Sequence, residues 1–230
     1  MTCPQQQAVD AAITSRRSIR AYLPQAVPRT EIAQILQVAG RAPSGTNTQP
    51  WKVYVLEGER KQALSQAILA IHNDPAQARL HTEEYAYYPR EWVAPFIDRR
   101  RKVGWDLYAL LGLTRENKAG MAAQHGKNYD FFGAPVGLIF TIDRVMAQGS
   151  WLDYGMFLQN VMVAARARGL DTCPQAAFTQ YHQVIAAQLQ LPANDMVVCG
   201  MALGYADLSK IENSLVTERM ALDEFVKFIS

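Results

Sequence analysis

The spacing of apolar residues along the first third of the chain alternates between helical and strand-like patterns. Apolar residues recur at helical spacing in 8–15 and again in 32–39, where Thr30 is the expected N-cap. Residues 51–56 alternate as a strand does, and 64–71 carries the apolar stripe of another helix. Helices and strands are therefore expected to follow one another along the chain.

Two continuous apolar runs, 134–142 and 196–203, predict buried strands in the second half of the chain. Between them, 152–168 has helical character and almost no charge before its end. Most of the circumference of this helix must therefore be buried, and Gly169 is expected to end it.

The remaining regular segments are short. Residues 170–174 predict a brief strand, and 181–189 predicts one more helix. No composition shift marks a linker, and there are no repeats, so we expect a single domain over 1–230. Because helices outnumber strands, the pattern favours an α+β fold in which helices cover a central mixed β-sheet.

Residues 73–130 interrupt this pattern. Aromatic side chains gather among many charges in 85–105, and Pro89 and Pro95 break the periodicity. We predict an excursion of short helices and loops that covers a pocket. A satellite core or a subunit contact is an equally open interpretation of these aromatics.

Composition describes a folded globular protein, with 49% hydrophobic and 19% charged residues among 230. A net charge of +2 argues against a nucleic-acid partner. No apolar run reaches the roughly 20 residues of a membrane span, and the first residues lack the apolar core of a signal peptide. Cys3, Cys173 and Cys199 are not regularly spaced, so we expect reduced thiols in a cytoplasmic protein.

Several familiar catalytic motifs are missing from the sequence. There is no G-x-G-x-x-G after a predicted strand, no P-loop, and no histidine beside a cysteine or carboxylate at metal-ligand spacing. The sequence thus offers no obvious nucleophile, general base or metal cage. Either the protein is not an enzyme or a cofactor carries the chemistry.

Two short stretches carry the candidate chemistry. The first, Arg16-Arg17-Ser18-Ile19-Arg20, places three guanidiniums and a hydroxyl together, which suits the bidentate binding of a phosphate. A solvated basic face or a helix end is the other interpretation of such a cluster. The second stretch, 42–51, reads Ala-Pro-Ser-Gly-Thr-Asn-Thr-Gln-Pro-Trp and falls, up to Pro50, in a predicted loop over 40–50.

In this order and at this spacing, the two stretches closely resemble the motifs of FMN-dependent nitroreductases. The resemblance extends over essentially the whole chain, and 73–130 is the part where that family varies most. Residues 131–135 and 149–155 look most like the bacterial branch that reduces nitrobenzoates and other nitroaromatics.

The resemblance implies a homodimer with flavin at the subunit interface. Arg16, Ser18 and Arg20 would hold the flavin phosphate, the ribityl chain and the pyrimidine edge, whereas the contact of Arg17 is less defined. A late phosphate-binding arginine would be Arg219. The complete expected flavin-binding set is Arg16, Arg17, Ser18, Arg20, Pro43, Ser44, Asn47, Cys173, Pro174, Gln175, Ala176, Ala177 and Arg219.

Two parts of this set have particular roles in the resemblance. Pro43, Ser44 and Asn47 would reach the flavin of the partner subunit. The loop 173–177 would lie against the reactive N5 edge, where one branch of the family has a Glu-Gly pair in place of Ala176-Ala177. That departure removes a side chain but leaves a backbone N–H donor.

The implied activity is the reduction of a nitroaromatic compound by NADH or NADPH, in ping-pong order, with flavin N5 and no protein side chain as the reacting centre. Which nicotinamide cofactor is preferred stays open. An enone, a quinone or a halogenated aromatic is the alternative substrate, and a non-catalytic flavin-binding protein is the alternative class. Arg99, Arg100 and Arg101 either meet a substrate carboxylate or form a solvated basic turn.

Overall fold

A four-stranded β-sheet forms the centre of the structure, a computed structural model that describes residues 3–229. The strands are β1 (Trp51–Glu57), β2 (Val136–Asp143), β3 (Asp171–Gln175) and β4 (Asp195–Gly204), in the order β1-β2-β4-β3. The expected α+β class is confirmed. The expectation of a mixed sheet is wrong for these strands, because all three pairs are antiparallel. Within 3–229, parallel pairing is confined to an isolated bridge between Ser18 and Thr172.

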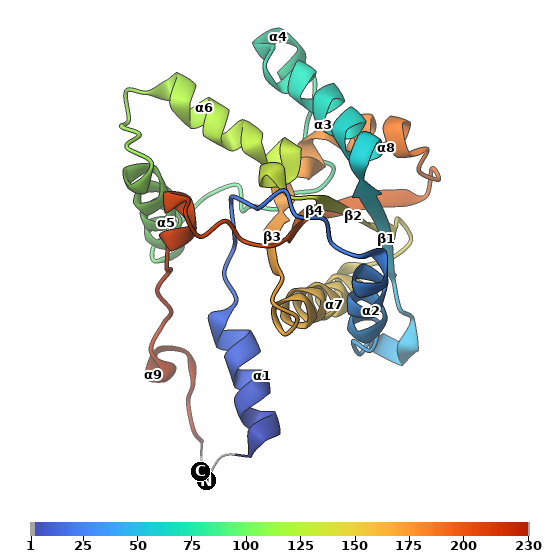
Figure 1. The fold of residues 1–230 in the computed structure, drawn as a ribbon, viewed down its shortest axis with the longest axis vertical. Helices are drawn as coiled ribbons and strands as arrows, with labels where there is room; N and C mark the ends of the chain where they lie inside the picture. Colours follow the sequence, from blue (N-terminus) through green and yellow to red (C-terminus); the bar gives the residue numbers. More distant parts are fainter. Residues whose placement is uncertain (1–2, 230) are drawn as a thin grey trace.

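Helices cover both faces of this sheet (Figure 1). The principal ones are α2 (Arg29–Ala39) and α7 (Gln148–Arg166) on one face, and α3 (Gly58–His72) and α8 (His182–Leu189) on the other. One core cluster joins Ile35 and Phe157 to the Leu138 face of β2, and a second joins Ile68 to the Ile139 face. Burial on both faces explains why β2 is a continuous apolar run although its neighbours are antiparallel.

The helix boundaries differ from the sequence prediction at one informative point. α2 begins at Arg29, and its N-cap position is Pro28, with no side-chain cap. Thr30 is therefore inside the first turn, and its predicted capping role is wrong. The Pro28 carbonyl accepts the backbone N–H groups of Glu31 and Ile32, so the turn closes without a side-chain cap. Gly169 ends α7 as predicted, at a φ of 74°.

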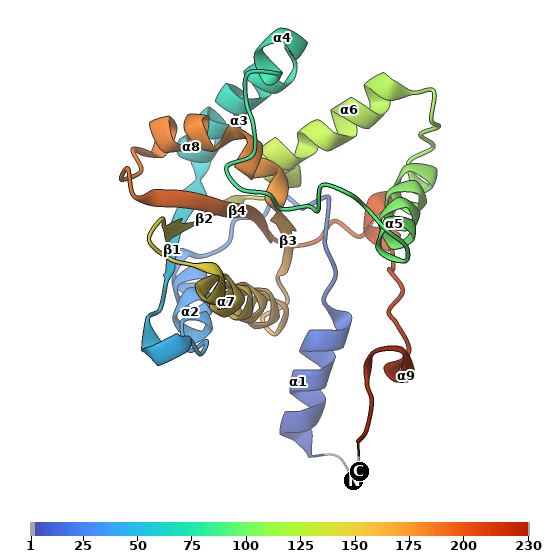
Figure 2. The ribbon, with the colours of Figure 1, turned by 180° about the vertical axis from the view of Figure 1, so that it is seen from behind.

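The excursion contains α4 (Pro75–Ala78), α5 (Phe96–Leu110) and α6 (Lys118–Gly126). Residues 79–95, which we call the strap, leave α4 and run across the sheet to α5 (Figure 2). α1 (Pro4–Ser15) and α9 (Leu222–Phe225) extend together away from the sheet. No helix within 3–229 is long and apolar enough to cross a membrane.

Short 3-10 turns complete the chain: η1 (Gly45–Asn47), η2 (Lys127–Gly133), η3 (Ala176–Tyr181) and η4 (Ile211–Ser214). Gly200 of β4 fixes the position of η3. A Cβ at Gly200 would lie 2.3 Å from the ring of Phe178, so the absence of a side chain lets that ring pack on the strand. The loop between β3 and η3 is thereby held against the sheet.

Candidate functional site

The basic N-terminal segment is extended and lies beside the start of β3. α1 ends at Ser15, and Ser18 then forms the parallel bridge with Thr172. The backbone N–H of Ile19 donates to the carbonyl of Thr172 at 3.1 Å, and Ile19 itself is buried. These contacts fix which side each side chain of the segment faces, so that Ile19 enters the core while its polar neighbours remain accessible.

A buried asparagine clamps the same segment from the other side. Asn213 accepts the backbone N–H of Arg20 at 2.8 Å through Oδ1. Its Nδ2 donates to the carbonyls of Ala21, at 2.8 Å, and Asp207, at 2.9 Å. Sequence reasoning missed Asn213, because no motif marks an asparagine two of whose three partners, Arg20 and Ala21, lie almost two hundred residues away.

Arg16, Ser18, Arg20 and Arg219 line a single cavity of about 680 Å³, which we call the cationic cavity. Its lining holds four arginines, including Arg17, and no carboxylate of the described residues 3–229. Such a wall attracts an anion, and guanidinium forks match the geometry of phosphate oxygens. The structure thus brings both ends of the sequence-predicted phosphate site together.

Arg17 faces in more than one direction. It lines the cationic cavity and also a second one beside Asp171. Burial raises the pKa of the Asp171 carboxyl, while the charges of Arg166 and Arg17 oppose that rise. The Arg17 guanidinium therefore has an electrostatic partner in Asp171, whereas no carboxylate of residues 3–229 lines the cationic cavity.

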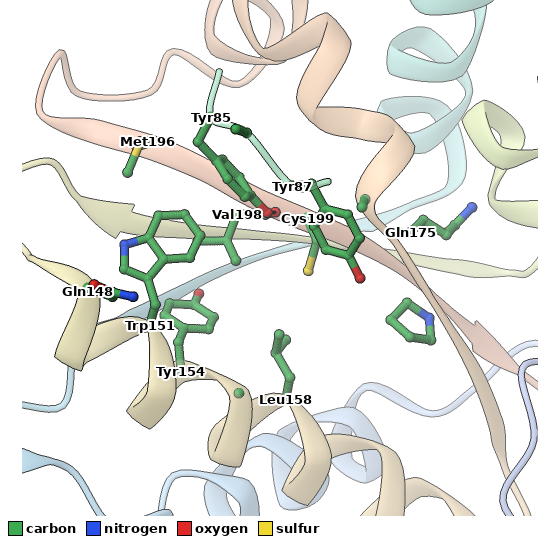
Figure 3. A pocket seen from close by; sticks show the side chains of 14 residues that line it. Tyr85, Tyr87, Gln148, Trp151, Tyr154, Leu158, Gln175, Met196, Val198 and Cys199 are labelled. Carbon is green, nitrogen blue, oxygen red and sulfur yellow. Dashed lines mark hydrogen bonds between the residues drawn. The ribbon is translucent and has the colours of Figure 1, made fainter. Parts of the chain in front are cut away.

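A cavity of about 650 Å³, the apolar cavity, lies between α7, β4 and the strap (Figure 3). Tyr85 and Tyr87 enter it from the strap, and Trp151 and Leu158 from α7 (Figure 3). The rings of Tyr85 and Trp151 have centroids 4.5 Å apart. No charged side chain of residues 3–229 lines this cavity, so its walls favour a flat apolar ligand.

A smaller cavity of about 190 Å³, the small cavity, shares one lining residue with each of the other two. Arg20 lines both it and the cationic cavity, and Pro174 lines both it and the apolar cavity. The cationic and aromatic walls therefore lie on either side of the segment pair that carries these two residues. One cationic and one aromatic cavity fit a ligand with an anionic end and a planar end, as FMN is.

Residues of the predicted loop 173–177 line both the small cavity and the apolar cavity. Gln175 is buried, and its Nε2 donates to the carbonyl of Asn128 at 2.7 Å. Its Oε1 is buried with no hydrogen-bond partner in the described part of the chain. A buried amide oxygen without a partner is costly, so a ligand donor in this cavity would satisfy it. Ala176 lines the apolar cavity, whereas Ala177 packs against the core.

The two cysteines near the site are poor nucleophiles. Burial raises the pKa of the Cys173 thiol to about 11, against the opposing influence of Arg20. Burial likewise raises the pKa of Cys199 to about 12. Both stay protonated near neutral pH, which agrees with the absence of a catalytic cysteine motif. Residues 3–229 also contain no cluster of histidine, cysteine and carboxylate groups that could hold a metal ion.

Pro43, Ser44 and Asn47 line neither the cationic nor the apolar cavity of their own chain. Their loop is fixed at the start of α7, where the Gly45 N–H donates to Asp153 Oδ2 at 3.0 Å. Asn47 has a φ of 62°, a left-handed conformation that costs free energy outside glycine. The structure thus separates this part of the predicted site from the arginines.

The three consecutive arginines of α5 also lie outside the apolar cavity. Arg100 stacks on the strap, with its guanidinium carbon 4.9 Å from the ring centroid of Trp92 and 5.3 Å from that of Tyr88. Arg99 and Arg101 are exposed. Arg99 and Arg101 are thus exposed as in the solvated interpretation, but they lie on the helix α5 and not in a turn, and Arg100 has a structural contact.

The described residues form an α+β protein in which an antiparallel sheet lies between helical layers, with one arginine-lined cavity and one aromatic cavity. The chain belongs to the Nitroreductase family, whose pattern matches residues 13–205. It is 44% identical over 220 residues to the 4-nitrobenzoate reductase of Pseudomonas putida, covering 96% of this chain and 95% of that protein. It is 40% identical to the chloronitrobenzene nitroreductase of Comamonas testosteroni, with 96% of each chain covered.

Solved structures give the same result for the fold. The FMN and NADPH-dependent nitroreductase NfnB from Sphigopyxis sp. strain HMH superimposes with a TM-score of 0.92, at 39% identity over 96% of this chain and 99% of that one. The FMN-dependent nitroreductase NfnB from Mycobacterium smegmatis, in complex with NADPH, also has a TM-score of 0.92, at 29% identity over 97% and 99% of the two chains. The resemblance inferred from the two motifs is confirmed.

Proposed function

We propose that this protein is an FMN-dependent NAD(P)H oxidoreductase that reduces nitroaromatic compounds. The observation that carries the proposal is a cavity lined by four arginines together with an uncharged aromatic cavity, each of which shares a wall residue, Arg20 or Pro174, with the small cavity. The names of its relatives support the substrate class: two are a 4-nitrobenzoate reductase and a chloronitrobenzene nitroreductase. NADPH is named with both NfnB structures, so we propose it as the first reductant to test.

The residues of the chain would hold the cofactor at its two ends. Arg16, Ser18, Arg20 and Arg219 bind the phosphate side, each charged hydrogen bond contributing about 1.5–3 kcal/mol. At the other end, Gln175 offers a buried acceptor and the backbone of Ala176 borders the ring site. Bound FMN supplies hydride transfer between the nicotinamide and the nitro compound. Of the other residues in the expected set, Arg17 lines the cationic cavity and Cys173 and Pro174 line the small cavity, whereas Ala177 packs against the core.

A homodimer goes with this proposal. Pro43, Ser44 and Asn47 do not line the cavities of their own chain, so a partner subunit is needed for their proposed contact with flavin. Exposed apolar side chains on the projecting segments support such pairing: Ile13 on α1 and Phe225, Phe228 and Ile229 near the C-terminus. Light scattering after size exclusion would measure a mass near 51 kDa for the dimer, twice the 25.7 kDa of the chain; a single-chain mass contradicts it.

The proposal includes the cover of the active site by 73–130, because Tyr85 and Tyr87 of the strap line the apolar cavity.

A cytoplasmic location is supported by three free cysteines. Ping-pong order for NADPH and the nitro compound is expected, since one apolar cavity borders the Pro174–Ala176 loop. Initial rates that fit only a ternary-complex scheme contradict that order.

The decisive experiment measures FMN binding and turnover with matched arginine variants. Purified protein is expected to be yellow, to release FMN on denaturation, and to be bleached by NADPH and reoxidised by nitrobenzene. Arg16→Ala and Arg219→Ala each remove a cation from the cationic cavity and should weaken FMN binding at least tenfold. Arg101→Ala, an equal loss of charge at an exposed position of α5, is the control.

Three results would count against the proposal in different ways. Colourless protein that cannot be reconstituted with FMN contradicts the flavoenzyme assignment. Flavin that binds but is not bleached by NADPH favours a non-catalytic flavin-binding protein. Unchanged FMN affinity in both arginine variants contradicts the assigned phosphate site.

A further inference from the structure

Within residues 3–229, the first half of β4 has no strand beside it on one edge. β3 pairs only with Gly200–Gly204, whereas β4 begins at Asp195. Backbone groups along 195–199 on that side therefore need other partners, because an unpaired N–H or carbonyl near the core costs free energy. The pairing of β2 with β4 also shifts register between Phe140 and Thr141, opposite this stretch.

Two consecutive strap residues take the place of the missing strand. The Glu84 carboxylate accepts the backbone N–H of Val197 at 2.8 Å. The Tyr85 hydroxyl donates to the backbone carbonyl of Val198 at 2.6 Å. One donor and one acceptor of β4 are thus satisfied by side chains that lie next to each other in the sequence, which fixes the strap in register with the strand.

Glu84 is buried for a carboxylate, with only 4% of its side chain exposed. Arg144 contacts it directly through Nη2, and His182 Nδ1 lies 3.3 Å from the same carboxylate. Arg144 also donates to the carbonyls of Ala193, at 3.0 Å, and Asp195, at 3.2 Å. A buried charge is tolerated when it is paired and hydrogen-bonded, so Glu84 joins the strap to α8, β4 and the end of β2.

The next residues form a wall of the apolar cavity. The Tyr85 ring lies 4.5 Å, centroid to centroid, from Trp151 on α7, and Tyr87 enters the same cavity (Figure 3). Further along, Arg100 stacks on Trp92 and holds the other end of the strap. Among the contacts of residues 3–229, Glu84 is the charged group that attaches the strap to β4, and it supports the hydroxyl bond and ring contact of the adjacent Tyr85.

We infer that Glu84 is a positioning residue for the aromatic substrate. It locks the strap onto the open edge of β4 and thereby fixes where Tyr85 and Tyr87 stand in the wall of the apolar cavity. This inference rests on the proposed nitroaromatic activity. Glu84 lines neither the cationic nor the apolar cavity, so its removal is expected to alter substrate affinity and leave FMN binding unchanged.

The test compares Glu84→Gln and Glu84→Ala with the wild-type holoenzyme. Glu84→Gln keeps an acceptor for Val197 but loses the charge that pairs with Arg144. We expect the KM for nitrobenzene to rise about threefold in Glu84→Gln and about tenfold or more in Glu84→Ala, because charged hydrogen bonds are lost. In both variants, kcat and FMN affinity should stay within about twofold of the wild-type values. Glu83→Gln, an equal change at the exposed neighbouring residue, is the control and should match the wild type.

Hydrogen exchange of the strap supplies a second readout that does not need turnover. Amides of 79–95 should exchange about tenfold faster in Glu84→Ala than in Glu83→Gln, while the helix α2 is unchanged. Unchanged KM, or unchanged exchange in the strap, overturns the positioning role, even if the variant melts at a lower temperature. Failure of the proposed function is distinct: the wild-type protein itself would neither retain FMN nor reduce nitrobenzene.

Discussion

The clamp formed by Asn213 allows a quantitative prediction. In Asn213→Ala, the side chain loses three hydrogen bonds of 2.8, 2.8 and 2.9 Å, to Arg20, Ala21 and Asp207. The residue is 4% exposed, so water cannot readily replace them. At about 1 kcal/mol for each bond, the free energy of unfolding should fall by about 3 kcal/mol. For a chain of this length the melting temperature should then fall by roughly 6–12 °C.

The assay is urea unfolding of the FMN-free protein followed by circular dichroism, together with FMN titration. FMN affinity should also fall, because the backbone of Arg20 lies in the segment that lines the cationic cavity. Asn213→Asp retains an acceptor for the Arg20 N–H but turns a carboxylate oxygen toward two carbonyls. It should therefore be at least as destabilised as Asn213→Ala.

Ser214→Ala, at the exposed neighbouring position, controls for a change in η4 and should lie within about 0.5 kcal/mol of the wild type. A loss below about 1 kcal/mol in Asn213→Ala would refute the reasoning, because the segment would then be held by other contacts. A variant that is destabilised but binds FMN normally would separate the clamp from the cofactor site.

Two further predictions concern reactivity and substrate choice. At pH 8, iodoacetamide should modify the exposed Cys3 alone, because pKa values of about 11 and 12 leave roughly a thousandth or less of Cys173 and Cys199 as thiolate. Intact-mass spectra that show two or three adducts on the native protein would contradict this. Nitrobenzene should have a lower KM than 4-nitrobenzoate, because no cation of the described chain lines the apolar cavity to pair with a carboxylate. The reverse order of the two KM values in steady-state assays would contradict this and would indicate a basic group from outside the lining of this cavity.

The elements were largely predictable from the sequence because their signals are local. The apolar run that becomes β2 follows directly from periodicity and burial. The nearly uncharged stretch forms the predicted helix α7, but the prediction that most of its circumference is buried is wrong within residues 3–229, where the buried residues share one side: Tyr154, Phe157, Val161, Ala164 and Ala165. The cap of α2 was mispredicted because Pro28 precedes the helix and no side chain is needed there. Strand direction was not legible, since an apolar run reports burial on both faces and says nothing of which way the neighbouring strand runs.

The residues of the candidate site also divide into those that the sequence predicted and those that it did not. Arg16–Arg20 and the 42–51 loop were recognisable because the residues that form each motif are close together in the chain. Glu84 and Asn213 were missed because each depends on backbone partners more than a hundred residues away. Single polar residues of this kind have no sequence signal of their own.

The sequence by itself determined the chemistry available to this protein: arginines suited to a phosphate, buried inert thiols, and no catalytic triad or metal motif. The tertiary structure decided which of these groups act together. It placed Arg219 and Arg16 on the wall of the same cavity, put an aromatic cavity within the same fold, and kept Pro43, Ser44 and Asn47 out of the lining of both. The reason is physical: residue type is set locally, whereas a binding site is set by distances that arise when the core clusters pack on both faces of the sheet.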